Sequence, residues 1–243
     1  MDRQTYDRMR LLQADHWWFR GKRRILAGLI GALDLTKPAK VLEVGCGPGG
    51  NLPMLGAFGE VVGLEPDEDS RAFAAENTGL RVEGGLLPDG LPFDPESFDL
   101  VCAFDVIEHV DEDQASVAAL ARLLKPGGYL ATTVPAQPWM WSRHDELHHH
   151  KRRYTMAPYR ALFEAAGVEI VKASYFNTLL FPPIAAIRAL KMLTKSTAAD
   201  DDAMPSAPVN GLLAAVFGSE LGWLKHASLP TGVSILLIAR RPS

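Results

Sequence analysis

The chain has 243 residues, of which 47% are hydrophobic and 22% charged, a composition that suits one packed globular domain with an elaboration. Its formal net charge of -4 argues against nucleic acid as the main partner, because no basic field is present to attract phosphates. Two cysteines, Cys46 and Cys102, cannot form a disulfide framework, and no uninterrupted apolar run reaches the roughly 18 residues that a membrane span needs. Because the charged N-terminus also lacks the apolar core of a secretory signal, we expect a cytoplasmic protein, with a peripheral membrane position left open.

Residues 1–35 read as an N-terminal helical extension. Three consecutive aromatic residues, Trp17–Phe19, are followed by a basic run, Lys22–Arg24. Adjacent residues of a helix point in different directions, so the three rings cannot all face one side. We therefore expect at least one ring to be exposed or to cover a pocket, and both core packing and a cofactor lid stay open for this segment.

An alternation of strands and helices follows the extension. Short runs rich in β-branched residues predict the strands, and the Pro and Gly of Lys125–Gly128 mark the end of one helix. The expected strands are residues 40–44, 60–64, 80–83, 98–104, 129–134, 168–174 and 232–239, and the expected helices are residues 67–77, 113–124 and 156–166. The pattern predicts an α/β fold with a Rossmann-like, seven-stranded, mostly parallel sheet and helices on both faces. Such a sheet binds its ligand beyond the carboxyl ends of the strands.

Residues 177–230 interrupt this alternation before the last strand. Two apolar stretches, Leu179–Leu193 and Leu212–Leu224, flank a segment rich in Ala, Ser, Asp and Pro, Lys195–Val209, which reads as a mobile loop. Basic residues around the first stretch favour an amphipathic surface helix. We expect a main domain over residues 36–243, in which 177–230 is an insert that caps a pocket, forms a dimer contact or rests on a membrane surface.

A glycine-rich loop follows the first expected strand. Gly45, Gly47 and Gly50 satisfy the G-x-G-x-x-G pattern, in which small residues let backbone N–H groups approach a ligand closely. Glu65 ends the second expected strand, where a carboxylate can accept both hydroxyls of a ribose. NAD and S-adenosylmethionine (SAM) both carry such a ribose, so these residues alone do not decide between the two.

The ordered set of motifs over residues 40–135 decides. It resembles the class I SAM-dependent methyltransferase family, and is most similar to the branch of ubiquinone-biosynthesis-type and related small-molecule enzymes. The motifs that carry the resemblance are Glu43–Gly49, Gly63–Asp67, Gly85–Asp89, Leu91–Phe93, Ser97–Asp99, Phe104–His109 and Leu124–Gly128.

The resemblance implies methyl transfer from SAM by in-line displacement to a small-molecule acceptor, O- or N-directed, which could be hydrophobic or lipid-linked. A SAM-binding or regulatory module without turnover is the alternative, followed by an NAD-dependent oxidoreductase. The small-molecule acceptor is the expected partner, nucleic acid is not, and the protein is expected to be a monomer or a homodimer.

The resemblance also implies where SAM binds. Gly45 and Gly47 would contact the methionine part and Glu65 the ribose. Gly85 and Leu86 would lie near the adenine, although the acidic residue that the family often has at this point is absent here. The complete expected set is Glu43, Gly45, Cys46, Gly47, Gly49, Asn51, Glu65, Pro66, Gly85, Leu86, Phe104, Asp105, Val106 and His109.

Titratable residues follow the fourth and the fifth expected strands and should face one cleft. His109 is the expected general base, because histidine titrates near neutral pH and a base assists a hydroxyl acceptor. His144 and Tyr154 are the other expected catalytic or acceptor-binding residues, with Asp145 and His149 as further choices. An amine or carboxylate acceptor would need no base.

No metal is predicted, because the spacing of the histidines matches no fixed zinc signature. Glu108 and His109 nevertheless resemble the Glu/His pair with which some members of that branch hold a divalent ion, and His144, His148 or His149 could complete such a set.

The basic run Lys151–Arg153 either offers guanidinium groups to a carboxylate or phosphate on the acceptor, or forms an exposed basic edge.

Overall fold

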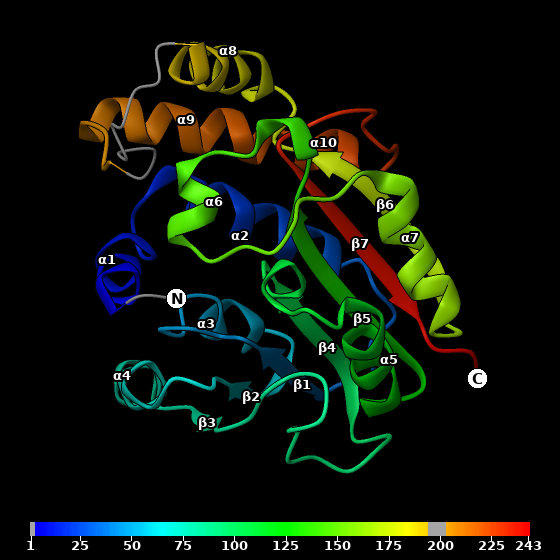
Figure 1. Cartoon of the computed structure of the whole chain (residues 1–243). Helices are drawn as coiled ribbons and strands as arrows, with labels where there is room; N and C mark the ends of the chain where they lie inside the picture. The colour runs from blue at the N-terminus through cyan, green and yellow to red at the C-terminus, as the bar shows by residue number, and fades with distance from the viewer. Residues whose placement is uncertain (1–2, 194–202) are drawn as a thin grey trace.

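The computed structural model describes residues 3–193 and 203–243, so that much of the expected mobile loop at 195–209 lies outside the described residues. A seven-stranded sheet forms the centre, with the strand order β3-β2-β1-β4-β5-β7-β6 (Figure 1). Only β7 runs antiparallel to its neighbours, which confirms the predicted mostly parallel α/β fold. The strands are β1 (Ala39–Val44), β2 (Gly59–Leu64), β3 (Arg81–Glu83), β4 (Phe98–Phe104), β5 (Leu124–Pro135), β6 (Glu169–Phe176) and β7 (Ser234–Arg240).

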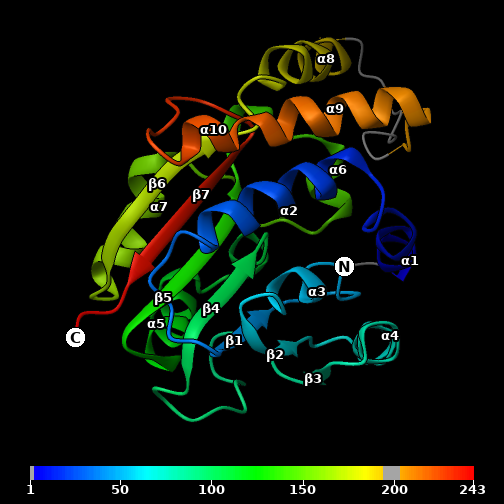
Figure 2. The ribbon, with the colours of Figure 1, turned by 180° about the vertical axis from the view of Figure 1, so that it is seen from behind.

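Helices cover both faces of this sheet, as expected. One face packs against α5 and α7, and the other against α2, α3, α9 and α10 (Figures 1 and 2). The helices are α1 (Arg3–Leu12), α2 (Trp17–Ile30), α3 (Leu52–Leu55), α4 (Glu68–Thr78), α5 (Asp113–Leu123), η1 (Ile107–His109), η2 (Pro138–Met140), α6 (Arg143–Leu147), α7 (Met156–Ala165), α8 (Phe181–Leu193), α9 (Ala207–Ser219) and α10 (Leu221–Leu224).

The central strands are buried on both faces because most of their residues are apolar and helices cover both sides. Every residue of β4 is buried, which is typical of a parallel strand covered by helices on both sides. The predicted start of β5 at residue 129 was wrong, because the strand begins at Leu124. Leu124 pairs with Phe98, the register then shifts, and pairing resumes between Tyr129 and Leu100. Gly127, with a φ of 78°, allows this irregular backbone. In the sequence, the Pro and Gly residues at this point predicted only the end of the preceding helix.

The extension and the insert pack against each other on one face of the sheet. The ring of Phe217 on α9 stacks on Trp18 at 5.3 Å and meets the edge of Trp17 at 6.1 Å between ring centroids. Phe217 and Leu224 are fully buried, so α9 and α10 form part of the core rather than a detachable cap. Within the insert, α8 is the outer helix (Figure 2).

Candidate functional site

A cavity of about 850 Å³ opens at the carboxyl ends of the parallel strands. Its wall joins the glycine loop, the end of β4, the aromatic residues of α2 and the inner side of α8. Most of the expected site residues line it, namely Gly45, Cys46, Gly47, Asn51, Glu65, Pro66, Gly85, Leu86, Phe104, Asp105, Val106, His109 and His144. Glu43, Gly49 and Tyr154 do not lie on this wall.

The glycine loop reverses direction sharply at the end of β1. Gly45 and Gly47 have φ angles of 67° and 52°, a region that side chains disfavour. A Cβ on Gly45 would also lie 2.6 Å from a methyl group of Val106. The loop can therefore hold its backbone close to a ligand only because these positions carry no side chain.

Glu65 connects this loop to the end of β2. One carboxylate oxygen accepts a hydrogen bond from the backbone N–H of Gly47 at 2.9 Å, and the other accepts one from the N–H of Asp67 at 3.0 Å. Only 3% of Glu65 is exposed. Two backbone donors thus fix the carboxylate on the cavity wall, where its remaining lone pairs can accept further hydrogen bonds.

Glu43 and Gly49 support the loop from behind. Glu43 accepts a hydrogen bond from the Asn51 side chain at 2.8 Å, and its burial raises the pKa of its carboxyl group to about 7. Gly49 packs against α4, where a Cβ would lie 3.1 Å from Ala74. The geometry gives both residues a role in shaping the loop and places neither of them against a ligand.

The loop after β3 forms another part of the cavity wall. Gly85 lies so close to Gly90 that a Cβ would approach the carbonyl oxygen of Gly90 to 2.5 Å. The N–H of Leu86 donates to that same carbonyl, and the Leu86 side chain is 61% exposed. Leu86 thus places an apolar side chain at the rim of the cavity.

Asp105 lies at the end of β4 with a φ of 56°, a strained conformation for a residue other than glycine. Its carboxylate accepts hydrogen bonds from the Lys22 ammonium at 2.6 Å and the Thr133 hydroxyl at 2.9 Å. Although desolvation favours the protonated form, these two donors hold the pKa of Asp105 below its ordinary value. Lys22 was missed by the sequence interpretation. Its place in the basic run after the aromatic residues was the available signal.

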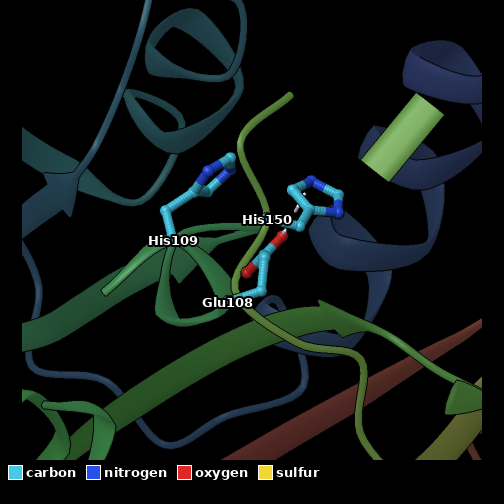
Figure 3. Close-up of side chains that lie close together, drawn as sticks. All are labelled: Glu108, His109 and His150. Atoms are coloured by element: carbon cyan, nitrogen blue, oxygen red, sulfur yellow. Dashed lines mark ion pairs between the residues drawn. The ribbon is translucent and has the colours of Figure 1, made fainter. Parts of the chain in front are cut away.

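Three side chains gather beyond Asp105 on the cavity wall. Figure 3 shows Glu108 and His109 from η1 next to His150 from the loop after α6. Their possible ligand atoms all lie within 4.8 Å of one another, and the rings of His109 and His150 meet edge to face at 4.8 Å. Of the histidines in this loop, His144, His148 and His149 were the ones considered able to join Glu108 and His109, whereas the structure brings His150 there.

The protonation of this cluster is set mainly by burial. Burial, together with the neighbouring His150 and His148, lowers the pKa of His109 to about 3, so His109 is neutral at pH 7. Burial and the Asp105 charge raise the pKa of Glu108 well above its ordinary value. A neutral histidine can offer a lone pair to a ligand, but it is a weak base at such a low pKa.

The structure turns Tyr154 away from the cavity, contrary to expectation. Its hydroxyl donates to Asp113 on α5 at 2.9 Å, and its ring packs against Tyr159 of α7 at 4.9 Å between centroids. Burial and the Asp113 charge raise the pKa of the phenol. Tyr154 therefore joins α5 to α7 and has no access to an acceptor. His149 is exposed and also lies off the cavity wall.

The basic run Lys151–Arg153 forms ion pairs within the protein. Arg152 pairs with Asp113 at 2.8 Å, and Arg153 donates to Asp145 at 2.7 Å and to the carbonyl oxygen of Ala136 at 3.0 Å. Arg153 is buried. The guanidinium groups thus order the loop itself, which the spacing of the sequence could not reveal.

Comparison with known proteins agrees with this arrangement. Residues 42–132 match the family model described as a methyltransferase domain. The chain is 35% identical over 98 residues to a ubiquinone biosynthesis O-methyltransferase of Vibrio atlanticus, covering 37% of this chain and 41% of that enzyme. It is 30% identical over 163 residues to a Mycolicibacterium smegmatis protein named "Probable S-adenosylmethionine-dependent methyltransferase", covering 65% and 62% of the two chains.

Solved structures share the fold. The methyltransferase complexed with the Haloferax volcanii Trm112 methyltransferase activator superposes with a TM-score of 0.65 at 19% identity, over 99% of this chain and 95% of that one. Phosphoethanolamine N-methyltransferase 2 of Haemonchus contortus, solved with SAM, gives a TM-score of 0.61 at 16% identity, over 90% and 52% of the chains.

Proposed function

We propose that the chain, whose residues 42–132 match the methyltransferase-domain model, is a class I SAM-dependent methyltransferase that transfers the methyl group of SAM to a small-molecule acceptor. One observation carries the proposal. The cavity continues from the glycine loop and Glu65 to the inner side of α8, so that it offers space for a donor and an acceptor together. An NAD-dependent oxidoreductase finds no support among the relatives reported above.

The cofactor end of the cavity matches the parts of SAM. The fixed carboxylate of Glu65 suits the two ribose hydroxyls, and the exposed side chain of Leu86 suits one face of the adenine. The methionine part then reaches toward the end of β4. There the ion pair of Lys22 and Asp105 offers a cation to its carboxylate and an anion to its ammonium group.

The acceptor end of the cavity combines apolar side chains with two basic ones, Arg188 and Lys191 of α8. Ile184 and Ile187 of α8 and Leu213 of α9 line it. Ile187 is also 54% exposed, and so is Leu190 of the same helix at 61%, which leaves an apolar outer edge. We propose a hydrophobic acceptor that enters beside α8, with this edge resting on a membrane surface. No helix among the described residues is long and apolar enough to cross a membrane.

Methyl transfer depends more on aligning the methyl donor with the acceptor atom than on activating the acceptor. The acceptor oxygen or nitrogen forms a bond to the methyl carbon while the carbon–sulfur bond breaks, and the electron pair stays on sulfur to give S-adenosylhomocysteine. A hydroxyl acceptor also gives up a proton. His109 lies on the wall, but with a pKa of about 3 it accepts that proton poorly. We therefore propose His144, on the same wall, as the base.

Calorimetric titration of the full chain tests the cofactor assignment. SAM should bind and NAD should not. Glu65→Ala should weaken SAM binding by about 10- to 100-fold, because two hydrogen bonds to a charged group are lost. The matched control is Glu83→Ala, which removes a carboxylate of β3 that pairs with Arg81. Equal SAM affinity in the Glu65→Ala variant and the wild type would refute the assignment.

A further inference from the structure

Helix α8 presents one face to the cavity, and that face carries apolar residues first and basic residues after them. Ile184, Ile187, Arg188 and Lys191 all line the cavity, with the spacing i, i+3, i+4 and i+7 that places side chains on one side of a helix. The sequence of α8 contains no acidic residue. The cavity wall under α8 therefore joins an apolar part to a cationic part.

The guanidinium group of Arg188 is held in a fixed position on this wall. Only 9% of Arg188 is exposed, although burying a charge is costly. Its Nη1 donates a hydrogen bond to the backbone carbonyl oxygen of Met140 at 2.9 Å, which orients the group without neutralising its charge. The five N–H donors of a guanidinium lie in one plane, a geometry that suits paired hydrogen bonds to a carboxylate or a phosphate.

Asp145 of α6 offsets the charge of Arg188 only in part. Nη1 of Arg188 lies 4.0 Å from the Asp145 carboxylate, whereas Arg153 contacts the same carboxylate at 2.7 Å and His150 contacts it at 2.8 Å. Arg153 and Arg188 are both buried, and both line the cavity. Two guanidinium groups thus share one carboxylate here, and a negatively charged group in the cavity would be attracted by both.

The acidic residues on the described part of the cavity wall do not reverse this positive field. They are Glu65, Asp105 and Glu108. Glu65 lies at the glycine loop, and Asp105 is paired with Lys22 at 2.6 Å. Burial and the Asp105 charge raise the pKa of the Glu108 carboxyl group well above its ordinary value, which favours its neutral form.

We propose that Arg188, assisted by Lys191, binds an acidic group of the methyl acceptor, a carboxylate or a phosphate, while Ile184 and Ile187 contact the apolar part of the same molecule. The acceptor is then an acidic amphiphile rather than a neutral hydrophobic compound. This inference rests on the proposed function, because it takes the space under α8 as the acceptor end of the cavity.

Calorimetric titration of the full chain with simple probes tests this specificity without turnover. Decanoate, decyl phosphate, decanol and decyltrimethylammonium are each titrated below the concentration at which they form micelles, with S-adenosylhomocysteine present to fill the cofactor end. Both acids should bind at least about 10-fold more tightly than the alcohol, because hydrogen bonds between charged groups are the stronger ones. The cation should bind most weakly, and the tighter of the two acids identifies the acidic group of the acceptor.

Substitutions on α8 assign the preference to its residues. Arg188→Gln should bring the acids to within about 3-fold of the alcohol, and Arg188→Lys, which keeps the charge but not the planar fork, should retain part of the preference. Lys191→Gln should weaken acid binding by about 3- to 10-fold. Arg160→Gln is the matched control and should bind every probe as the wild type does, because Arg160 pairs with Glu164 on α7 and does not line the cavity.

Two outcomes would overturn the proposal. One is a wild-type chain that binds neither acid, or binds both no more tightly than decanol. The other is a preference for the acids that is unchanged in the folded variants Arg188→Gln and Lys191→Gln. Circular dichroism and the Tm of each variant separate lost recognition from lost folding, and Lys191 is partly exposed, so Lys191→Gln keeps the test decisive if Arg188→Gln is unstable.

Binding of S-adenosylhomocysteine is measured separately in the same series. A chain that binds S-adenosylhomocysteine but shows no preference for the acids loses only this inference. A chain that does not bind S-adenosylhomocysteine contradicts the proposed function itself.

Discussion

Glu43 links the glycine loop to the pH dependence of stability. Burial raises the pKa of its carboxyl group to about 7 from an ordinary value of 4.5. The folded state therefore holds a proton that the unfolded state has already released between these two values. The stability that this bound proton contributes to the folded state is fully present below pH 4.5 and is lost as the pH rises toward 7.

We predict that Glu43→Gln removes this loss. The variant keeps the oxygen that accepts the Asn51 hydrogen bond, but it carries no titrating proton. Relative to the wild type, its free energy of unfolding should rise by roughly 3 kcal/mol between pH 4.5 and pH 8. Urea unfolding of both proteins at the two pH values measures this. If the free energies of unfolding of the variant and the wild type differ by the same amount at both pH values, Glu43 is not protonated in the folded protein.

The positions of individual site residues could be predicted where a sequence motif specifies them. Glu65 and Gly47 follow from the order of glycine loop, strand and acidic residue, and the structure joins them with a hydrogen bond of 2.9 Å. Lys22 and His150 did not follow, because each reaches the cavity from a part of the chain outside the motif set. The prediction for Tyr154 was wrong, because its position after β5 does not determine on which face of the sheet its side chain lies.

At the scale of elements, the contact between α2 and α9 joins the extension to the insert. Gly21 faces Phe217 of α9 so closely that a Cβ would lie 2.5 Å from its ring, and Gly28 faces Leu221 of α10 in the same way at 2.4 Å. Phe217 is fully buried and also stacks on Phe176 of β6. Helix α2 therefore packs tightly against both α9 and α10, and its contact with α9 holds the aromatic residues of α2 over the cavity.

We predict that Gly21→Ala lowers the free energy of unfolding by about 1–3 kcal/mol, because the added methyl group overpacks the Phe217 ring. Gly211→Ala on α9 is the control. None of the described atoms lies within 4 Å of the added Cβ there, so the change should stabilise the helix by about 0.5–1 kcal/mol. Thermal or urea unfolding gives both values. A Gly21→Ala variant as stable as Gly211→Ala would mean that α2 and α9 are loosely packed.

The order of strands and helices was predictable because apolar periodicity dominates in a sheet that is buried on both faces. The predicted strand at 98–104 coincides with β4, and the predicted helix at 113–124 differs from α5 by one residue. The role of 177–230 was not predictable, because two apolar stretches do not say whether they cover the sheet or the cavity. The structure divides them, with α9 and α10 in the core and α8 along the wall of the cavity.

In the whole molecule, one cavity extends from the ends of β1, β2 and β4, where we propose that SAM binds, to the space under α8, where we propose that the acceptor binds. We predict turnover, because the proposed donor and acceptor positions lie in the same cavity. The most direct measurement is mass spectrometry of the full chain incubated with methyl-labelled SAM and a lipid and small-molecule extract. We expect S-adenosylhomocysteine to accumulate in step with one labelled acceptor, and to do so only with active protein. A protein that binds SAM but forms no S-adenosylhomocysteine with any fraction of the extract would contradict the account and would instead be a binding module.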